Sequence, residues 1–234
     1  HQLIQKAQEL SKPSMVMTFE PLPREYFSGD STPSRLMLLR DKLNYFKKLS
    51  VDYVLCLKFD RHLANLSAKD FINVILLKYL QPSALLVGED FRFGKGREGD
   101  TVLLQEICEE KGFSVEVIPK IVQDKDWISS TRIRDAVCRD DWDCVRQLLG
   151  RNYSIEGRVV HGRKLGRTLG FPTANIDLRG INLPISGVFA VHVFGLSEKP
   201  LLGAANIGYK PTLNGVKKLL EVHLFDFNEL IYGK

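Results

Sequence analysis

The sequence contains few cysteines, and they do not follow a pattern that binds zinc or forms a redox pair. Its four cysteines (Cys56, Cys108, Cys138 and Cys144) include no CxxC pair and no zinc-site spacing. They are interpreted as reduced thiols of a cytoplasmic protein. The sequence also lacks an apolar run long enough to span a bilayer, and nothing in it resembles a signal peptide. These absences argue against a disulfide-stabilised secreted protein and against an integral membrane protein.

Basic residues are in excess, but they are not concentrated in one segment. The 234 residues carry a formal net charge of +5. This excess suits a polyanionic partner such as a nucleotide, a flavin phosphate or a nucleic acid. There is no lysine-rich run and no alternation of basic and aromatic residues, which argues against DNA or RNA binding. The content of 44% hydrophobic and 26% charged residues is ordinary for a soluble protein of one or two domains.

The first 150 residues alternate between helical patterns and short apolar runs. This alternation predicts an α/β domain with a parallel, doubly wound sheet, in which ligands bind at the carboxyl ends of the strands. The strands are expected at 14–19, 51–59, 84–88 and 113–121. The helices are expected near residue 3, from Thr32, from Ser67 to about Leu80, from Asp100 to Lys111, from Ile128, and from Asp141 to Leu149.

The pattern changes after Gly150, and we place a domain boundary between residues 150 and 151. Beyond it, short apolar runs alternate with turns rich in glycine, proline and asparagine, which predicts a small antiparallel β-barrel. The expected strand regions are 153–160, 174–176, 188–194, 202–207 and 219–225.

The stretch 166–175, Gly-Arg-Thr-Leu-Gly-Phe-Pro-Thr-Ala-Asn, combines glycines with paired oxygen donors. If Thr173 and Asn175 lie on a strand, their side chains point the same way. A hydroxyl and an amide oxygen are ligands that Mg²⁺ accepts beside phosphate oxygens. Gly166 and Gly170 would let backbone N–H groups approach an anion. An ordinary Gly/Pro turn before a strand explains the same residues equally well.

Two further segments lie next to the expected carboxyl ends of parallel strands. Pro21, Pro23 and Phe27 follow the first strand, where they could form the wall of a flat-ring site or simply close the core. Asp90, Phe91 and Phe93 follow the strand 84–88. The next six residues, 94–99, formally match GxGxxG. A dinucleotide site is disfavoured because residues 90–93 separate this loop from the strand, and a loop that meets phosphates fits as well.

Polar residues occupy two other places of interest. The segment 128–134, Ile-Ser-Ser-Thr-Arg-Ile-Arg, opens a helix, where hydroxyls cap free N–H groups and the same N–H groups bind anions. A plain cap with surface arginines is the alternative. Glu221 lies in an apolar strand pattern and shares a face with His223. Its carboxylate could accept the proton of an alcohol, or it could be an ordinary outward-facing residue.

These segments together resemble the bacterial bifunctional riboflavin kinase/FAD synthetases, and the resemblance spans nearly the whole chain. Three segments resemble the kinase module of that family: Gly-Phe-Pro-Thr-Ala-Asn at 170–175, 205–212 and 220–227. Three earlier segments resemble its adenylyltransferase module, in the same order as in the family: 18–27, 87–94 and 128–134.

The resemblance implies a Rossmann-like nucleotidyltransferase domain at 1–150 and a β-barrel riboflavin kinase domain at 151–234. The kinase would convert riboflavin to FMN with MgATP. The adenylyltransferase would transfer AMP from ATP to FMN, giving FAD and pyrophosphate. The alternatives are an enzyme with only one of these activities and a flavin-binding protein without catalysis. The family begins with a histidine-rich motif and ends with a further strand and helix, so the chain is expected to be short at both ends.

The resemblance also implies roles for individual residues. In the kinase, Glu221 would be the base, Thr173 and Asn175 would hold Mg²⁺, and the phosphates of ATP would meet Gly162, Gly166, Gly170 and Pro172. In the adenylyltransferase, Arg134 would be catalytic and ATP would contact His1, Ser129, Ser130, Thr131 and Arg132. The flavin would bind at Pro21, Pro23, Phe27, Asp90, Phe91 and Phe93.

Overall fold

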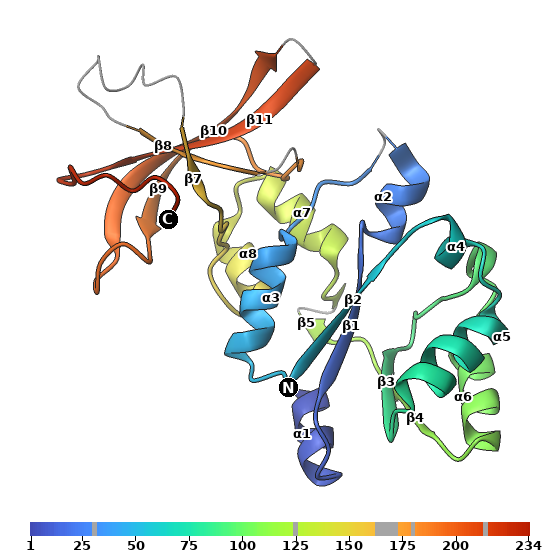
Figure 1. Ribbon diagram of the computed structural model, residues 1–234. Coiled ribbons are helices and arrows are strands. Elements are labelled where there is room, and N and C mark those ends of the chain that lie inside the picture. The colour runs from blue at the N-terminus through green and yellow to red at the C-terminus, as the bar shows by residue number, and fades with distance from the viewer. Residues whose placement is uncertain (30–31, 124–125, 162–172, 179–180, 213–214) are drawn as a thin grey trace. The chain divides into compact units, whose positions relative to one another are not determined.

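The computed structural model describes residues 1–29, 32–123, 126–161, 173–178, 181–212 and 215–234 (Figure 1). The chain divides into two compact units. Unit 1 comprises His1–Pro33 and Leu43–Ile128, and unit 2 comprises Ser34–Lys42 and Ser129–Lys234.

The strands of unit 1 form two parallel pairs. Strand β1 (Met15–Glu20) pairs with β2 (Tyr53–Lys58), and β3 (Ala84–Gly88) pairs with β4 (Ser114–Ile118). The parallel direction confirms the expectation from sequence. Among the described residues no backbone ladder joins the two pairs, so one continuous doubly wound sheet is not formed.

A shared hydrophobic core unites these two pairs. Residues from β1 and β3 pack on it together, with Phe19 on one strand and Val87 on the other. Most of the core comes from helical segments, because their apolar residues recur on one side and are buried there. Its fully buried members are Ala68, Phe71, Ile72, Leu76, Phe93, Leu104 and Cys108.

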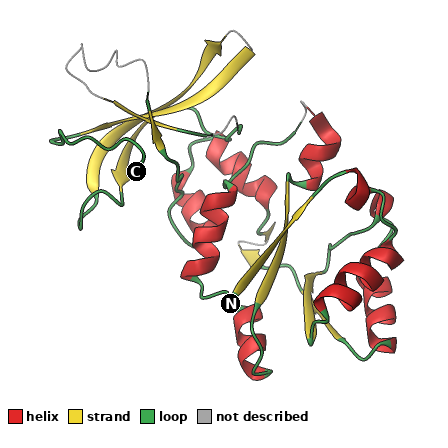
Figure 2. Ribbon diagram, viewed as in Figure 1, coloured by secondary structure: helices red, strands yellow, loops and turns green. Residues whose placement is uncertain are grey.

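Helices occupy most of the remaining length of unit 1 (Figure 2). They are α1 (Gln2–Glu9), α2 (Pro23–Ser28), α3 (Leu39–Lys48), α4 (Arg61–Ala64), α5 (Ala68–Asp70), the π-helix η2 (Phe71–Leu80), the 3₁₀ turn η3 (Lys95–Arg97) and α6 (Thr101–Glu110). A short hairpin follows, made of β5 (Val122–Gln123) and β6 (Asp126–Trp127). None of the helices in the described part of the chain is both long and apolar enough to cross a membrane.

Side-chain caps explain where several of these helices begin. The Ser67 hydroxyl accepts from the Asp70 N–H at 3.1 Å, and the Asp100 carboxylate accepts from the Leu103 N–H at 3.0 Å. The sequence predicted helices that start at Ser67 and at about Asp100, and the structure shows that both residues satisfy N–H groups that have no partner in the first turn.

The predicted helix start at Thr32 is wrong. Helix α3, whose first four residues belong to unit 2, begins at Leu39 because the buried Asp41 carboxylate accepts from the Leu38 N–H at 2.9 Å. The same carboxylate accepts from the Glu156 N–H at 2.9 Å. Burial raises the pKa of Asp41, while these two hydrogen bonds act in the opposite direction. The sequence could not reveal this cap, since one donor is 115 residues away.

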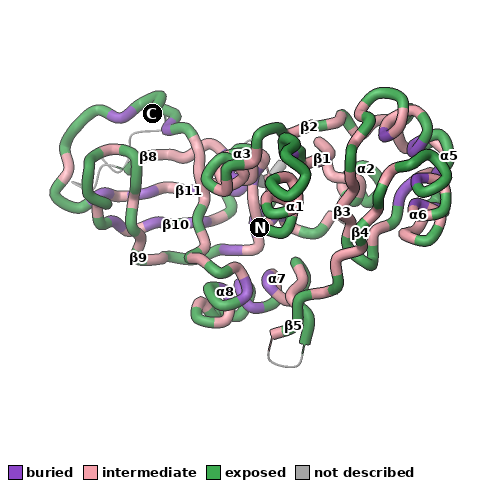
Figure 3. Tube along the Cα trace, turned by 90° about the horizontal axis from the view of Figure 1, so that it is seen from below, coloured by how far each residue is buried: buried purple, intermediate pink, exposed green. Residues whose placement is uncertain are grey.

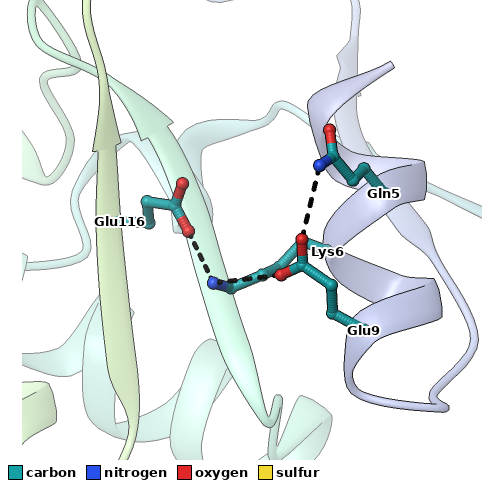
Figure 4. A network of polar contacts seen from close by, with 4 residues as sticks. All are labelled: Gln5, Lys6, Glu9 and Glu116. Atoms are coloured by element: carbon teal, nitrogen blue, oxygen red, sulfur yellow. Dashed lines mark hydrogen bonds and ion pairs between the residues drawn. The ribbon is translucent and has the colours of Figure 1, made fainter.

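Helix α1 is amphipathic and contains no buried residue, and it is tied to β4 by charge. Lys6 Nζ lies 3.0 Å from Glu116 Oε2 on β4 and 3.7 Å from Glu9 Oε2 one turn further along the helix (Figure 4). The hydrogen bond to Glu116 raises the pKa of Lys6. Exposed ion pairs contribute little to stability. The main effect of this pair is therefore to fix the position of α1 relative to β4.

Unit 2 combines two helices with an antiparallel sheet. The helices are α7 (Ser130–Cys138) and α8 (Trp142–Leu149), and α8 ends at Gly150 with φ of 67°. The strands are β7 (Val159–Val160), β8 (Thr173–Ile176), β9 (Gly187–Val193), β10 (Leu201–Thr212) and β11 (Gly215–Leu224). Their order is β7-β8-β11-β10-β9, and the described strands do not close into a barrel. The strand expected at 153–160 is reduced to its last two residues.

Burial alternates along the central strands of this sheet (Figure 3). Leu220, Val222 and Leu224 on β11 are buried, whereas Glu221 and His223 between them are partly exposed. The buried face continues on β10 at Ala205 and Ile207. This two-residue period turns one face of the sheet towards the core and leaves the other face partly accessible.

The GxGxxG-like loop at 94–99 is packed against the core of unit 1. Phe93 and Gly99 exchange backbone hydrogen bonds of 3.1 and 2.9 Å, which close the loop. The Glu98 carboxylate accepts from the Ala68 N–H at 2.8 Å. At Gly94, where φ is +74°, a Cβ atom would lie 2.6 Å from the Ala68 nitrogen. The loop therefore closes on itself and on α5, unlike a dinucleotide-binding turn that leads directly into a helix.

Gly94→Ala is expected to destabilise unit 1 by about 3 kcal/mol, because it combines a left-handed backbone with a backbone clash. Gly96→Ala is the matched control: φ is +63°, but nothing lies within 4 Å of the added Cβ, so a cost of about 1 kcal/mol is expected. Urea unfolding followed by Trp127 fluorescence in a Trp142→Phe background measures the difference. Equal costs for the two variants would contradict the packing argument.

Candidate active sites

The β8–β11 register brings together the residues predicted for phosphoryl transfer. Glu221 pairs with Asn175, and His223 pairs with Thr173. Directly paired residues of antiparallel strands have their side chains on the same face, as do residues two apart on one strand. Thr173, Asn175, Glu221 and His223 therefore share one face of the sheet. The sequence predicted each pair separately, and the strand register joins them.

This face is the one turned away from the buried side of the sheet. Thr173 is exposed, and Asn175, Glu221 and His223 are half-buried. The His223 ring packs edge-on against Phe225, with 5.6 Å between the ring centroids. A carboxylate beside hydroxyl and amide oxygens on an accessible face can receive a proton from a bound alcohol.

The predicted phosphate loop of the kinase lies outside the described residues. This applies to Gly162, Gly166, Gly170 and Pro172. Their assignment to ATP stays a prediction.

The hydroxyl-rich segment before α7 is a helix cap, as predicted. The Ser129 hydroxyl accepts from the Arg132 N–H at 3.2 Å, and Ser130 begins the helix. Thr131 is exposed in the first turn. Arg134 donates from Nε to the Ser34 carbonyl oxygen at 2.6 Å, so this guanidinium also holds the segment that precedes α3. Sequence reasoning did not find this second contact, which spans 100 residues.

An aromatic cluster lies beyond the carboxyl ends of β1 and β2. Pro21 and Pro23 follow β1, and Pro23 begins α2. Phe27 is 67% exposed, and its ring meets those of Tyr26 and Phe59 edge-to-face at 5.2 and 5.8 Å. Sequence reasoning missed Phe59. It directly follows β2, so the rule that ligands bind at carboxyl ends could have identified it.

The segment after β3 carries a second, more buried aromatic pair. Asp90 is exposed, Phe91 is half-buried, and the two phenylalanine rings stack with centroids 5.3 Å apart. Phe93 is only 6% exposed, and its ring centroid lies 5.5 Å from that of Phe71. Phe93 thus supports Phe91 from within the core. Among the described ring contacts none joins this pair to Phe27, although β1 and β3 pack on the same core.

The residues predicted for adenylyl transfer are distributed over both compact units. His1 is exposed at the start of α1 in unit 1, and its side chain forms no capping hydrogen bond. The aromatic residues belong to unit 1 as well, whereas 129–134 belong to unit 2. Within each unit the local geometry is as described, and the assembly of all these residues into one site stays a prediction.

Comparisons with known proteins identify one family for each of two parts of the chain. The FAD synthetase family model matches residues 1–132, and the riboflavin kinase family model matches 149–234. The bifunctional riboflavin kinase/FMN adenylyltransferase of Escherichia coli strain K12 is 49% identical over 99% of this chain and 74% of its own length. The protein of the same description from Haemophilus influenzae is 49% identical over 99% of this chain and 75% of its own length.

A solved structure is similar over nearly the whole chain. It is described as the crystal structure of a macrolide-efflux protein from Streptococcus pneumoniae, with a TM-score of 0.79 and 29% identity. The match covers 98% of this chain and 75% of that one. The word efflux describes the Streptococcus pneumoniae protein and is not applied to this chain. Matches to both catalytic modules in one chain, with relatives 49% identical over almost its full length, show that this chain belongs to the family of bifunctional riboflavin kinase/FMN adenylyltransferases.

Proposed function

We propose that this protein makes FMN and then FAD in two ATP-dependent steps. Its riboflavin kinase module phosphorylates the ribityl chain of riboflavin, and its FMN adenylyltransferase module transfers AMP from ATP to FMN. The observation that carries the kinase assignment is the register that places Thr173 and Asn175 on the same face as Glu221. This face lies in the segment matched by the riboflavin kinase family model.

In the kinase step, Glu221 is the general base. Its carboxylate accepts the proton of the terminal ribityl hydroxyl as that oxygen attacks the γ-phosphorus of ATP. The bond between this phosphorus and the bridging oxygen breaks, and ADP leaves with the electron pair. Positioning and charge neutralisation dominate such transfers, so no covalent enzyme intermediate is needed.

Thr173 and Asn175 fit a magnesium site shared with phosphate. They offer two neutral oxygens on one face, and no group of three or more acidic, histidine or cysteine residues suited to a metal occurs among the described residues. Mg²⁺ commonly takes only one or two protein ligands and completes its shell with water and substrate phosphates. The ion would neutralise charge on the transferring phosphate. Gly162, Gly166, Gly170 and Pro172 are proposed to cover the ATP phosphates.

In the adenylyl transfer step, the FMN phosphate attacks the α-phosphorus of ATP and pyrophosphate leaves. We assign the N-terminus of α7, with Ser129, Ser130 and Thr131, to the ATP phosphates, where N–H groups favour anions. Arg132 and Arg134 stabilise the charge that develops there. His1 is assigned to ATP as well. The flavin is assigned to Pro21, Pro23, Phe27, Asp90, Phe91 and Phe93.

The finer fold and the domain limits are also part of this proposal. The parallel pairs of unit 1 belong to a Rossmann-like nucleotidyltransferase domain, and the antiparallel sheet belongs to a small β-barrel. The boundary between residues 150 and 151 is supported by the end of α8 at Gly150 and by the start of the kinase match at residue 149. Because both steps consume ATP, we place the protein in the cytoplasm, where its four free cysteines stay reduced.

Chromatography of two reactions with ATP and Mg²⁺, one started from riboflavin and one from FMN, tests the two activities. FMN from the first reaction and FAD from the second are expected. FMN without FAD would leave only the kinase, and FAD without FMN would leave only the adenylyltransferase. Flavin that stays bound but unconverted would contradict the proposal in favour of a binding protein.

Glu221→Gln is expected to lower kcat for FMN formation by about 100-fold or more, the range measured for loss of a general base. FAD formation from supplied FMN should stay within about twofold of the wild type, since that step does not use this face. Glu198→Gln, a change at an exposed glutamate between β9 and β10, is the control and should alter neither rate. Equal loss of both activities in Glu221→Gln would remove Glu221 from the kinase site.

Arg134→Ala should have the opposite effect. Loss of a charge-stabilising guanidinium is expected to reduce FAD formation about 100-fold while FMN formation is retained. Arg139→Ala, at the exposed C-terminal end of α7, is the matched control. Since Arg134 also donates to Ser34, Arg134→Lys and a thermal unfolding scan separate loss of chemistry from loss of this contact. Unchanged FAD synthesis would exclude a catalytic role for Arg134.

Phe27→Ala should raise KM for FMN in FAD synthesis by about fivefold, because an exposed ring that stacks on a flavin contributes about 1 kcal/mol. Little stability should be lost, since the ring is 67% exposed. Tyr79→Ala removes a ring of similar exposure (69%) from the same unit and should leave KM unchanged. A similar effect of both substitutions would contradict the flavin assignment.

A further inference from the structure

Asn206 lies directly opposite Glu221, on the side away from the predicted metal ligands. Glu221 on β11 pairs with Asn175 on β8 and with Asn206 on β10. The three side chains therefore form one row across neighbouring strands, with an amide on each side of the carboxylate. Neighbouring strands are separated by about 4.8 Å, so each amide is within hydrogen-bonding reach of a group held at Glu221. Asn206 lies in the segment 205–212 that resembles the kinase module, but the sequence assigned it no role.

The surface of β10 beside Asn206 carries only small side chains. Asn206 is exposed, and the residues two positions away on the same face are the small Ala204 and Gly208. A Cβ atom added at Gly208 would have only Asn206 Oδ1 near it, at 4.0 Å. Small residues on both sides of a polar one leave the strand backbone open to a ligand, and glycine in a strand is typical of such a close approach.

We propose that Asn206 binds the ribityl hydroxyls of riboflavin and so positions the terminal hydroxyl for Glu221. This inference rests on the proposed kinase function. In phosphoryl transfer the attacking and leaving oxygens lie roughly in line on opposite sides of the phosphorus. With the metal and the ATP phosphates on the β8 side, at Thr173 and Asn175, the chain that carries the attacking hydroxyl extends to the β10 side.

The chemistry of the side chain matches this substrate. A carboxamide has both donors and an acceptor, as a polyol does, so one asparagine can hydrogen-bond to two neighbouring hydroxyls of an open chain. It is neutral, so it does not compete with Glu221 for the proton. The flavin ring also offers donors and acceptors on one edge, so the assignment to the ribityl chain rests on position: Asn206 lies directly opposite Glu221, where the attacking ribityl hydroxyl is placed.

Steady-state kinetics of FMN formation test the proposal. Asn206→Ala should raise KM for riboflavin about tenfold, the effect of one lost hydrogen bond. KM for ATP should stay within about twofold, because ATP lies on the β8 side. Asn206→Ser keeps a donor and an acceptor and should recover most of the loss. Val188→Ala is the control: Val188 pairs with Asn206 in the same row, one strand further from Glu221, and is 73% exposed.

Two readouts separate a substrate contact from a structural role. FAD formation from supplied FMN should be unchanged in every variant, which reports on folding of the other module. A structural role would move KM for both riboflavin and ATP, or would appear in Val188→Ala as well. Either result, or an unchanged KM for riboflavin in Asn206→Ala, would overturn the inference. Failure of the wild-type protein to form FMN would instead overturn the kinase function itself.

Discussion

The pairing register of β11 with its two neighbours is the constraint on which the kinase face depends. Because side chains alternate between faces along a strand, a slip of one residue would turn Glu221 towards the core and Leu220 or Val222 towards solvent. The buried leucine and valine side chains of β11 resist this slip, since exposing each would cost about 2 kcal/mol. Apolar packing on one face therefore sets the position of the carboxylate on the other.

Unit 1 depends on a comparable relation between its core and its strand ends. The core around Phe71, Ile72 and Leu104 holds β1 and β3, and the residues beyond their carboxyl ends carry the aromatic surfaces. Phe93 extends from this core to support Phe91, while Phe59 and Tyr26 support Phe27. In unit 1 the two aromatic side chains proposed to meet the flavin, Phe27 and Phe91, therefore each pack on a less exposed ring, that of Phe59 or Phe93. Such backing reduces the conformational freedom that a substrate contact would otherwise have to remove.

The two reactions have the same physical requirement. Each must bring ATP and a flavin substrate together and neutralise the negative charge of the reacting phosphates. Neither needs a nucleophile from the protein, and the residues proposed for the two sites are one carboxylate, hydroxyls, amides and arginines. The product of the kinase is a substrate of the adenylyltransferase, so one chain supports two consecutive steps.

The sequence by itself determined the local elements and the candidate residues. The alternation of apolar runs predicted most strands, hydroxyl caps predicted the starts of α5 and α7, and the Gly-Phe-Pro-Thr-Ala-Asn stretch identified the kinase module. These signals are local, since each depends on residues within about one turn or one strand.

Only the tertiary structure decided which residues face one another. The row formed by Asn175, Glu221 and Asn206 depends on strand register, and the start of α3 depends on a carboxylate shared with Glu156. The packing of Gly94 on Ala68 and the meeting of Phe27 with Phe59 are equally remote in sequence. Spacing along the chain carries no information about such contacts, because they are selected by burial of the whole core and not by neighbouring residues.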